Sequence, residues 1–201
     1  MRVNKFFAAL AAIFMSGAVA GAANLSLLSG PNYSDPSQVL ATVNTLIQNI
    51  NTGVGGLVNA QTGTATTSVA TTTEQTLLSY TLAPGALATA GQSIRAYCWG
   101  HTSANTNNKT MKLYFGSTSV TTPAAGTNNL GWWLEIIVMR RTATTQGFLG
   151  KGLVNTTAVA PSLSDAAENL ANSVLIKCTG TNGNASSNEI TASGMIVESI
   201  K

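Results

Sequence analysis

Apolar and polar residues alternate along most of the chain after about residue 66. Met111, Leu113 and Phe115 fall on one face of an extended segment, whereas Lys112 and Tyr114 fall on the other. Similar runs, separated by Gly, Asn and Pro, predict strands near 68–72, 76–83, 92–100, 109–121, 130–142, 147–155, 173–179 and 189–200. The pattern predicts a mainly β, antiparallel β-sandwich over 66–201, and about eight strands favour a jelly-roll-like arrangement.

Three further predictions concern one loop and the charged residues in or near the strands. The stretch 161–171 interrupts the alternation, and we expect a loop with one helical turn that Asp165 caps. Arg95 lies inside an apolar run and is expected to pair with Glu74 or Glu135. Arg140 and Arg141 either pair with Glu135 or a neighbouring subunit, or form a charged strand end that resists edge pairing.

One helix is predicted before the strands, from about 36 to 52. Asp35 is a suitable cap, Pro36 suits the first helical position, and Gly53 suits the end. Apolar residues recur at helical spacing and form a single stripe, whose candidate interface positions are Val39, Val43, Leu46 and Ile50. The stripe packs either on the β-domain or against the same helix of other copies. The Gly-, Thr- and Ala-rich segment 53–67 is expected to be an extended connector.

The N-terminus resembles a secretory signal. Arg2 and Lys5 precede an apolar run over 6–15, and small residues follow at 18–22. Either this segment is cleaved after export, or it remains as an apolar arm that docks on a partner. The domain prediction is therefore a signal-like or apolar arm over 1–23, an anchoring segment over 24–65 and the β-sandwich over 66–201.

The composition of the chain argues against an enzymatic function. Only 8% of residues are charged, and the chain contains a single histidine, His101. Without Arg2 and Lys5, 8 basic residues face 7 acidic ones, which predicts no nucleic-acid footprint. No grouping of acids, bases and nucleophiles resembles a catalytic or metal-binding motif. We therefore expect a non-enzymatic protein with no catalytic residues, no cofactor and no metal.

Two cysteines and two adjacent tryptophans are the remaining candidates. Cys98 and Cys178 each fall on the apolar face of a predicted strand, so they form either one disulfide or two separate buried thiols. Trp132 and Trp133 point to opposite faces, because neighbouring residues in a strand do so. One is expected in the core, and the other is a candidate for a protein interface or a sugar platform.

Three segments carry a resemblance to a known class of protein. They read TEQTLLSYTL at 73–82, GQSIRAYCWG at 91–100 and KTMKLYFG at 109–116. This succession resembles the β-sandwich domains of tailed-bacteriophage virion proteins, of the capsid decoration and head-fibre types. The resemblance covers about 66–201 and transfers no catalytic motif. It implies a non-enzymatic structural module that forms homotrimers and binds the major capsid or other virion proteins.

Two functional hypotheses follow. The first is a virion protein, a capsid decoration (cement) protein or head-fibre component, that attaches through its N-terminal region and oligomerises through its β-domain. The second is a secreted or periplasmic adhesin or carbohydrate-binding module, released after signal cleavage and able to bind a glycan. It rests on the signal-like start, the two cysteines and the outward-facing aromatic residues.

Overall fold

The computed structural model describes residues 57–61, 65–67 and 69–200, and every regular element in this part of the chain is a β-strand. No helix long and apolar enough to cross a membrane occurs among these residues. The strands are β1 Leu57–Gln61, β2 Ala65–Thr66, β3 Gln75–Leu82, β4 Ser93–Thr102, β5 Ala104–Phe115, β6 Thr118–Thr121, β7 Ala125–Asn128, β8 Gly131–Arg140, β9 Gln146–Val154, β10 Thr157–Ala166, β11 Val174–Asn182 and β12 Ile190–Ile200.

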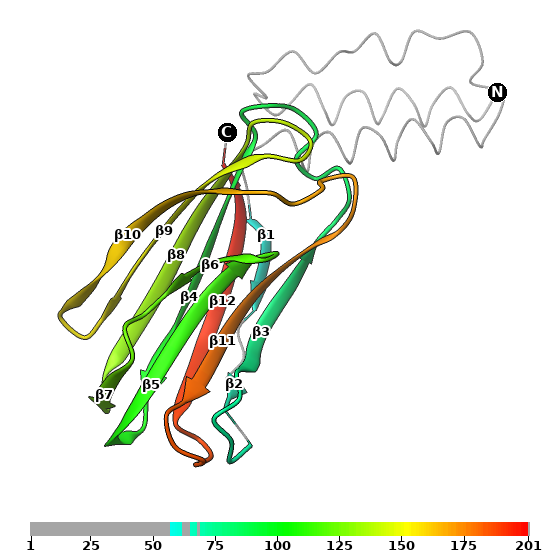
Figure 1. Ribbon diagram of the computed structural model, residues 1–201. Coiled ribbons are helices and arrows are strands. Elements are labelled where there is room, and N and C mark those ends of the chain that lie inside the picture. Colours follow the sequence, from blue (N-terminus) through cyan, green and yellow to red (C-terminus); the bar gives the residue numbers. More distant parts are fainter. Residues whose placement is uncertain (1–56, 62–64, 68, 201) are drawn as a thin grey trace, which may run out of the picture. The chain divides into compact units, whose positions relative to one another are not determined.

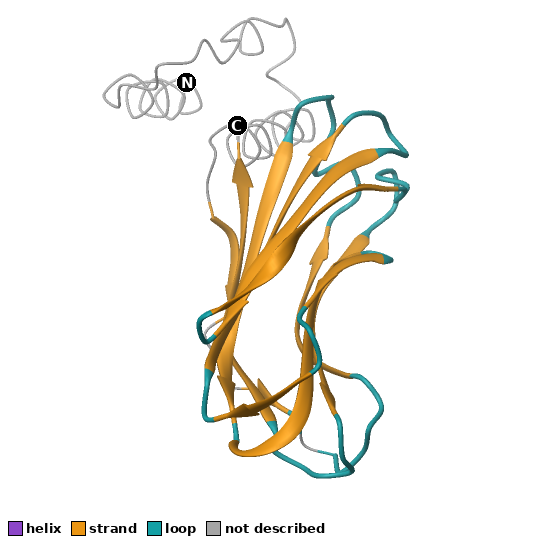
Figure 2. Cartoon of the chain, turned by 60° about the vertical axis from the view of Figure 1, so that its left-hand side comes forward, coloured by secondary structure: helices purple, strands orange, loops and turns teal. Residues whose placement is uncertain are grey.

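Two antiparallel sheets face each other as a sandwich (Figures 1 and 2). The large sheet has seven strands in the order β1-β12-β4-β8-β9-β10, with β2 also pairing with β12. The small sheet has five strands in the order β3-β11-β5-β6, with β7 also pairing with β5. The expected antiparallel β-sandwich is confirmed.

The strand pairs connect distant parts of the chain in a nested order. The first long pair, β1 with β12, joins the two ends of the described chain, and β3 with β11 lies next inside it. The pairs β4 with β8 and β5 with β6 are nested further in. Hairpin β9–β10 then extends the large sheet beyond β8. The chain therefore crosses repeatedly between the two layers, and the core is assembled from residues far apart in sequence.

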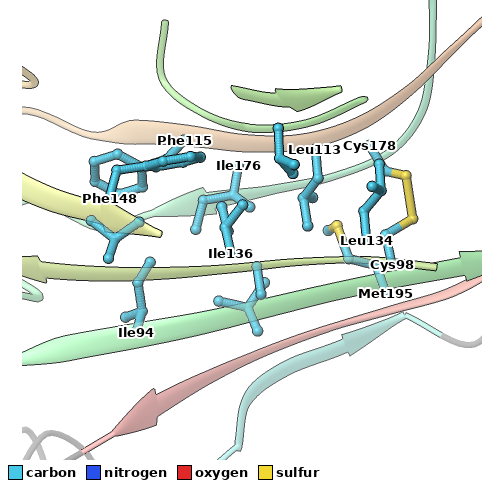
Figure 3. Close-up of a cluster of buried hydrophobic side chains, with 14 of the residues drawn as sticks. Ile94, Cys98, Leu113, Phe115, Leu134, Ile136, Phe148, Ile176, Cys178 and Met195 are labelled. Atoms are coloured by element: carbon cyan, nitrogen blue, oxygen red, sulfur yellow. A yellow bond between two sulfur atoms is a disulfide. The ribbon is translucent and has the colours of Figure 1, made fainter. Parts of the chain in front are cut away.

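The core lies between the sheets and consists of the inward half of each alternating strand. Figure 3 shows Leu134 and Ile136 of the large sheet facing Leu113 and Ile176 of the small sheet. All four side chains are fully buried. Along β8 the burial alternates from residue to residue, as the sequence pattern predicts. One face of each sheet is therefore used by the core, and the other is left outside.

A disulfide crosses the core. Cys98 of β4 and Cys178 of β11 are bonded, with an S–S distance of 2.23 Å (Figure 3). Of the two alternatives left open by the sequence, the structure has the bridge. It joins the large sheet to the small sheet across 80 residues of chain.

The expected loop over 161–171 is wrong for its first half, because β10 runs through Pro161 to Ala166, whereas residues 167–171 are loop and turn. Pro161 lacks the N–H that a central strand needs, but β10 is an edge strand of the large sheet. The pairing with β9 is also irregular between Val159 and Ser162, at the position of the proline. Asp165 consequently lies in a strand opposite Gly147 and caps no turn.

Other strand boundaries also differ from the sequence prediction. The run 109–121 is divided into β5 and β6, because Gly116 adopts a left-handed conformation with φ of 57° and makes a turn. The sequence also missed the short strand β7. No strand forms in the described part of 68–72, where residues 69–73 bend, and β1 and β2 form within the stretch expected to be a connector. Because β1 pairs with β12, the sandwich begins by Leu57.

The predicted arm over 1–23 and the helix over 36–52 lie outside the described residues. The same applies to the candidate interface positions Val39, Val43, Leu46 and Ile50. These predictions remain predictions.

Candidate functional site

The outer face of the large sheet carries most of the large apolar side chains that the core does not use. In β4 and β8 the odd-numbered residues point outward, because their even-numbered neighbours are buried. Trp132 is accordingly in the core, with 2% of its surface exposed, and Trp133 lies on the outer face. The expectation of one core tryptophan and one outward tryptophan agrees with this arrangement.

Three aromatic side chains lie together on this face and form what we call the aromatic platform: Tyr97, Trp99 and Trp133. The ring centroids of Tyr97 and Trp99 are 5.5 Å apart, with 34° between the ring planes. Those of Tyr97 and Trp133 are 5.6 Å apart, with 28° between the planes. Trp99 and Trp133 are also direct neighbours across the β4–β8 pair. The three rings thus form one continuous group on two adjacent strands.

A glycine makes room for the platform on the neighbouring strand. Gly194 of β12 is paired with Trp99, next to an irregularity in the β12–β4 register. A Cβ atom at Gly194 would lie 2.4 Å from Cζ2 of Trp99, with two further atoms of the indole ring within 3.0 Å. Only a residue without a side chain permits this contact. The indole of Trp99 therefore rests directly on the backbone of β12.

An open hollow of about 620 Å³ lies over the platform. It extends from β12 across β4 and β8 to β9 and the β9–β10 turn. Its lining residues are Tyr97, Trp99, Gly100, Gly131, Trp132, Trp133, Leu153, Asn155 and Ile196.

Two ion pairs border the platform. Lys151 Nζ of β9 lies 3.3 Å from the carboxylate of Glu135 on β8, and the Glu135 side chain is only 12% exposed. Arg95 pairs with Glu198 of β12, which lies opposite it in the sheet register. Burial raises the pKa of Tyr97, and the carboxylate of Glu135 raises it further, so the phenol keeps its proton at neutral pH.

The predicted partners of Arg95 are therefore wrong. Glu135 is opposite Lys151 in the β8–β9 register and pairs with it. Glu74 precedes β3 of the other sheet, where its carboxylate accepts from Lys112 Nζ at 2.8 Å. The sequence alone does not show which strands are neighbours, so it could not show which charged residues would pair.

Farther along the same outer face is a second group, which we call the apolar patch: Ile137, Met139, Leu149 and Leu163. Met139 is 44% exposed and Leu163 on edge strand β10 is 80% exposed. The patch lines a hollow of about 640 Å³. Its border holds the ion pair of Arg141 with Asp165, at 2.5 Å. Arg140 takes no part in this ion pair, and its guanidinium donates to the carbonyl oxygen of Leu87.

The outer face of the small sheet has a different character. Lys112 and Glu74 form an ion pair there, and the Tyr114 hydroxyl also donates to Glu74, at 3.1 Å. Lys177 Nζ lies 4.7 Å from the centroid of the Tyr114 ring, within the range of a cation–π contact. Burial raises the pKa of Glu74, but hydrogen bonds, chiefly from Lys112, lower it more. The charged side chains of this face thus gather around Tyr114, whereas the large sheet groups its aromatic and aliphatic side chains between ion pairs.

A buried ion pair closes the end of the sandwich where β5 and β12 begin. Lys109 Nζ lies 3.2 Å from the carboxylate of Glu189, and the two side chains are 0% and 4% exposed. Burial raises the pKa of Glu189, but hydrogen bonds from four side chains outweigh it and lower the pKa to about 2. The donors are Ser103, Asn107, Asn105 and Lys109. No sequence motif marks this pair.

No group of three or more His, Cys, Asp or Glu side chains that could hold a metal ion occurs within residues 57–61, 65–67 and 69–200. His101 is exposed at the end of β4.

Comparisons with known proteins identify no family. No family model and no curated protein match the sequence. Among solved structures, one similar chain is an alginate lyase in complex with alginate trisaccharide, with a TM-score of 0.36, 8% identity, and coverage of 76% of this chain and 90% of the lyase. Another comes from infectious bursal disease virus, with a TM-score of 0.28, 14% identity, and coverage of 73% of this chain and 32% of the viral chain. Similarity at this level identifies neither a family nor a function, and the resemblance to phage virion domains stays a prediction.

Proposed function

We propose that this chain is a non-enzymatic structural protein of a virion, a capsid decoration or head-fibre component, that works through surfaces offered to its neighbours. The observation that carries the proposal is the apolar patch. Contiguous exposed apolar surface on a soluble domain marks an interaction site, because leaving it in water is unfavourable. Met139 and Leu163 are the most exposed members of that patch.

The strand order supports the same proposal. Nested pairing, with β1-β12-β4-β8 in one layer and β3-β11-β5-β6 in the other, is the order of a jelly roll extended by hairpin β9–β10. Jelly rolls serve in viral capsids and in lectins, so the fold alone does not select between these functions. It does provide a rigid body whose outer sheet faces can carry different contacts.

The proposed assembly is a homotrimer in which the apolar patch of each copy meets a sister copy. The uncharged Thr- and Asn-rich composition reduces the desolvation that such contacts require. The N-terminal region then fastens the trimer to the major capsid protein or another virion protein. Three weak anchors on one trimer act together, because binding of the first raises the effective concentration of the others.

Charge placed in the patch tests the interface. We expect the Leu163→Lys and Met139→Lys variants to sediment as single chains, because a buried unpaired ammonium opposes association. The unmodified protein is expected at about three times the mass of a single chain, measured by light scattering or native mass spectrometry. Leu175→Lys is the matched control, because Leu175 is 43% exposed on the outer face of the small sheet and Met139 is 44% exposed.

A monomeric unmodified protein would exclude the trimer. An unchanged oligomeric mass in both patch variants would instead show that the interface between copies lies outside the apolar patch.

A further inference from the structure

We propose that the aromatic platform is a binding subsite for an uncharged oligosaccharide, separate from the apolar patch through which copies associate. The site comprises Tyr97, Trp99 and Trp133, with Glu135, Lys151 and Asn155 at its border. This activity goes beyond the structural role proposed above and does not depend on it.

The first reason is the grouping of the rings. Trp99 rests on the backbone at Gly194, so β12 supports its indole from below. Tyr97 lies within 5.6 Å, centroid to centroid, of both Trp99 and Trp133, so the three rings form one aromatic surface. Such a surface complements the C–H groups of a pyranose ring, because the electron-rich rings attract C–H groups.

The second reason is the set of polar groups at the border of the platform. The Glu135 carboxylate accepts hydrogen bonds, and the Lys151 ammonium has three N–H donors, of which an ion pair with one carboxylate needs only one. Asn155 lines the hollow from the β9–β10 turn, where its backbone N–H donates to the carbonyl oxygen of Gly131 at 2.8 Å. A sugar offers hydroxyls that both donate and accept, and it can satisfy all three side chains.

The third reason is charge. Lys151 is balanced by Glu135, and Arg95 is balanced by Glu198. The surface therefore has no net positive charge that would attract a polyanion such as nucleic acid. An uncharged ligand does not depend on such attraction. A purely apolar partner is also unfavourable, because it would remove water from Glu135, Lys151 and Asn155 without replacing their hydrogen bonds.

The fourth reason is size. The hollow is open along the sheet, so a ligand can lie across several strands. It crosses β12, β4, β8 and β9, a width of about 14 Å at the normal spacing of neighbouring strands. This width accommodates several linked sugar rings, so the occupant is an oligosaccharide and not a monosaccharide.

The experiment titrates the full-length protein with cellohexaose, chitohexaose and maltohexaose by calorimetry and by tryptophan fluorescence. We expect saturable binding of at least one of the three, with a change in fluorescence because Trp99 and Trp133 lie in the site. Trp133→Ala should weaken that binding by at least about tenfold, since it removes a central ring. Trp133→Phe keeps an aromatic face and should retain most of the affinity.

Tyr114→Ala is the matched control, because it removes an aromatic ring from the outer face of the small sheet. Its affinity should equal that of the unmodified protein. The comparison of Trp133→Phe with Trp133→Ala separates loss of binding from loss of folding, and thermal unfolding of each variant checks it directly.

Three outcomes would overturn the proposal. These are no binding of any of the three hexasaccharides, equal affinity in Trp133→Ala and the unmodified protein, or a Trp133→Ala variant that loses its oligomeric mass without losing sugar affinity. The last outcome would assign the platform to a second copy of the chain. A failure here leaves the apolar-patch interface untouched, because Leu163→Lys and Met139→Lys probe different residues.

Discussion

Lys109 and Glu189 show how this fold accommodates charge in its buried interior. The ammonium of Lys109 donates to the backbone oxygens of Asn105 and Asn107, at 3.2 and 2.9 Å, and to Oδ1 of Asn105, at 2.8 Å. Glu189 completes the surroundings and accepts from Ser103 at 2.7 Å. Such a network is stable only while every member has its partner, since an unpaired buried charge is strongly unfavourable.

Substitution of Glu189 by Gln is expected to lower the free energy of unfolding by about 3–5 kcal/mol at pH 7, because it leaves the Lys109 ammonium buried without a carboxylate. The folded pKa of about 2 lies below the ordinary value of 4.5, so ionised Glu189 stabilises the fold above about pH 4.5. That contribution is lost as the pH falls toward 2. The difference between Glu189→Gln and the unmodified protein should therefore narrow between pH 5 and pH 2, measured by urea unfolding.

Glu198→Gln provides the comparison for this prediction. Its ion pair with Arg95 is partly exposed, at 29% and 47%, and should contribute less than about 1 kcal/mol. Equal stability of Glu189→Gln and the unmodified protein at pH 7 would show that the buried pair is dispensable.

The burial of Lys109 could be predicted from the sequence, although a charged side chain is not normally expected in a core. Lys109 has the same parity as Met111, Leu113 and Phe115, so the alternation of β5 places it on the inward face. What the pattern could not show is Glu189, which is 80 residues away along the chain. Only the pairing of distant strands brings a carboxylate to that position.

At the scale of single elements, the platform depends on a strand that carries none of its rings. We expect Gly194→Ala in β12 to displace the Trp99 indole, because the new Cβ would lie 2.4 Å from Cζ2. The free energy of unfolding should fall by about 1–3 kcal/mol, the range for an added methyl group in a tightly packed site. Urea unfolding and near-ultraviolet circular dichroism measure the two effects.

Gly131→Ala supplies the control, because a Cβ at Gly131 would meet nothing closer than a backbone oxygen at 4.0 Å. Its stability and spectrum should match those of the unmodified protein. A Gly194→Ala variant that is equally unperturbed would mean that Trp99 is not held against β12.

Strands whose residues alternate cleanly could be predicted from the sequence, and those shaped by a neighbour could not. β4 and β8 have one buried face, and the burial reads directly from their residues. β10 has seven exposed residues, one of them a proline, so it has no alternation to recognise, and it forms because β9 offers it an edge. The aromatic platform is intermediate: the outward direction of Tyr97, Trp99 and Trp133 was predictable, but their contact across β4 and β8 required the register.

At the scale of the whole molecule, removal of residues 1–56 tests the proposal that the N-terminal region attaches the protein to the virion while the β-sandwich folds and associates without it. The deletion ends just before β1, so it keeps every described strand pair. The shortened protein should melt at nearly the temperature of the full chain and should no longer co-sediment with the particles that carry the full-length protein. Undiminished co-sedimentation of a folded, shortened protein would place the anchor in the β-sandwich.

The same material distinguishes the virion hypothesis from the secreted one. Mass spectrometry of the protein from its natural source reports whether the chain begins at Met1 or near Ala20–Ala23. The sequence predicted an antiparallel sandwich from turn spacing, because turns and alternation are local properties. Partners and localisation are properties of surfaces meeting other molecules, and no local pattern specifies them.

The Cys98–Cys178 bond also determines how the protein responds to a mechanical load. Tension applied at the two ends passes through the sulfur atoms, so the chain between the two cysteines is shielded from extension. At about 3.5 Å per residue, roughly 280 Å of chain stays out of reach until the bond is reduced. While the bond is intact, extension is confined to the residues before Cys98 and after Cys178, and the two sheets stay joined.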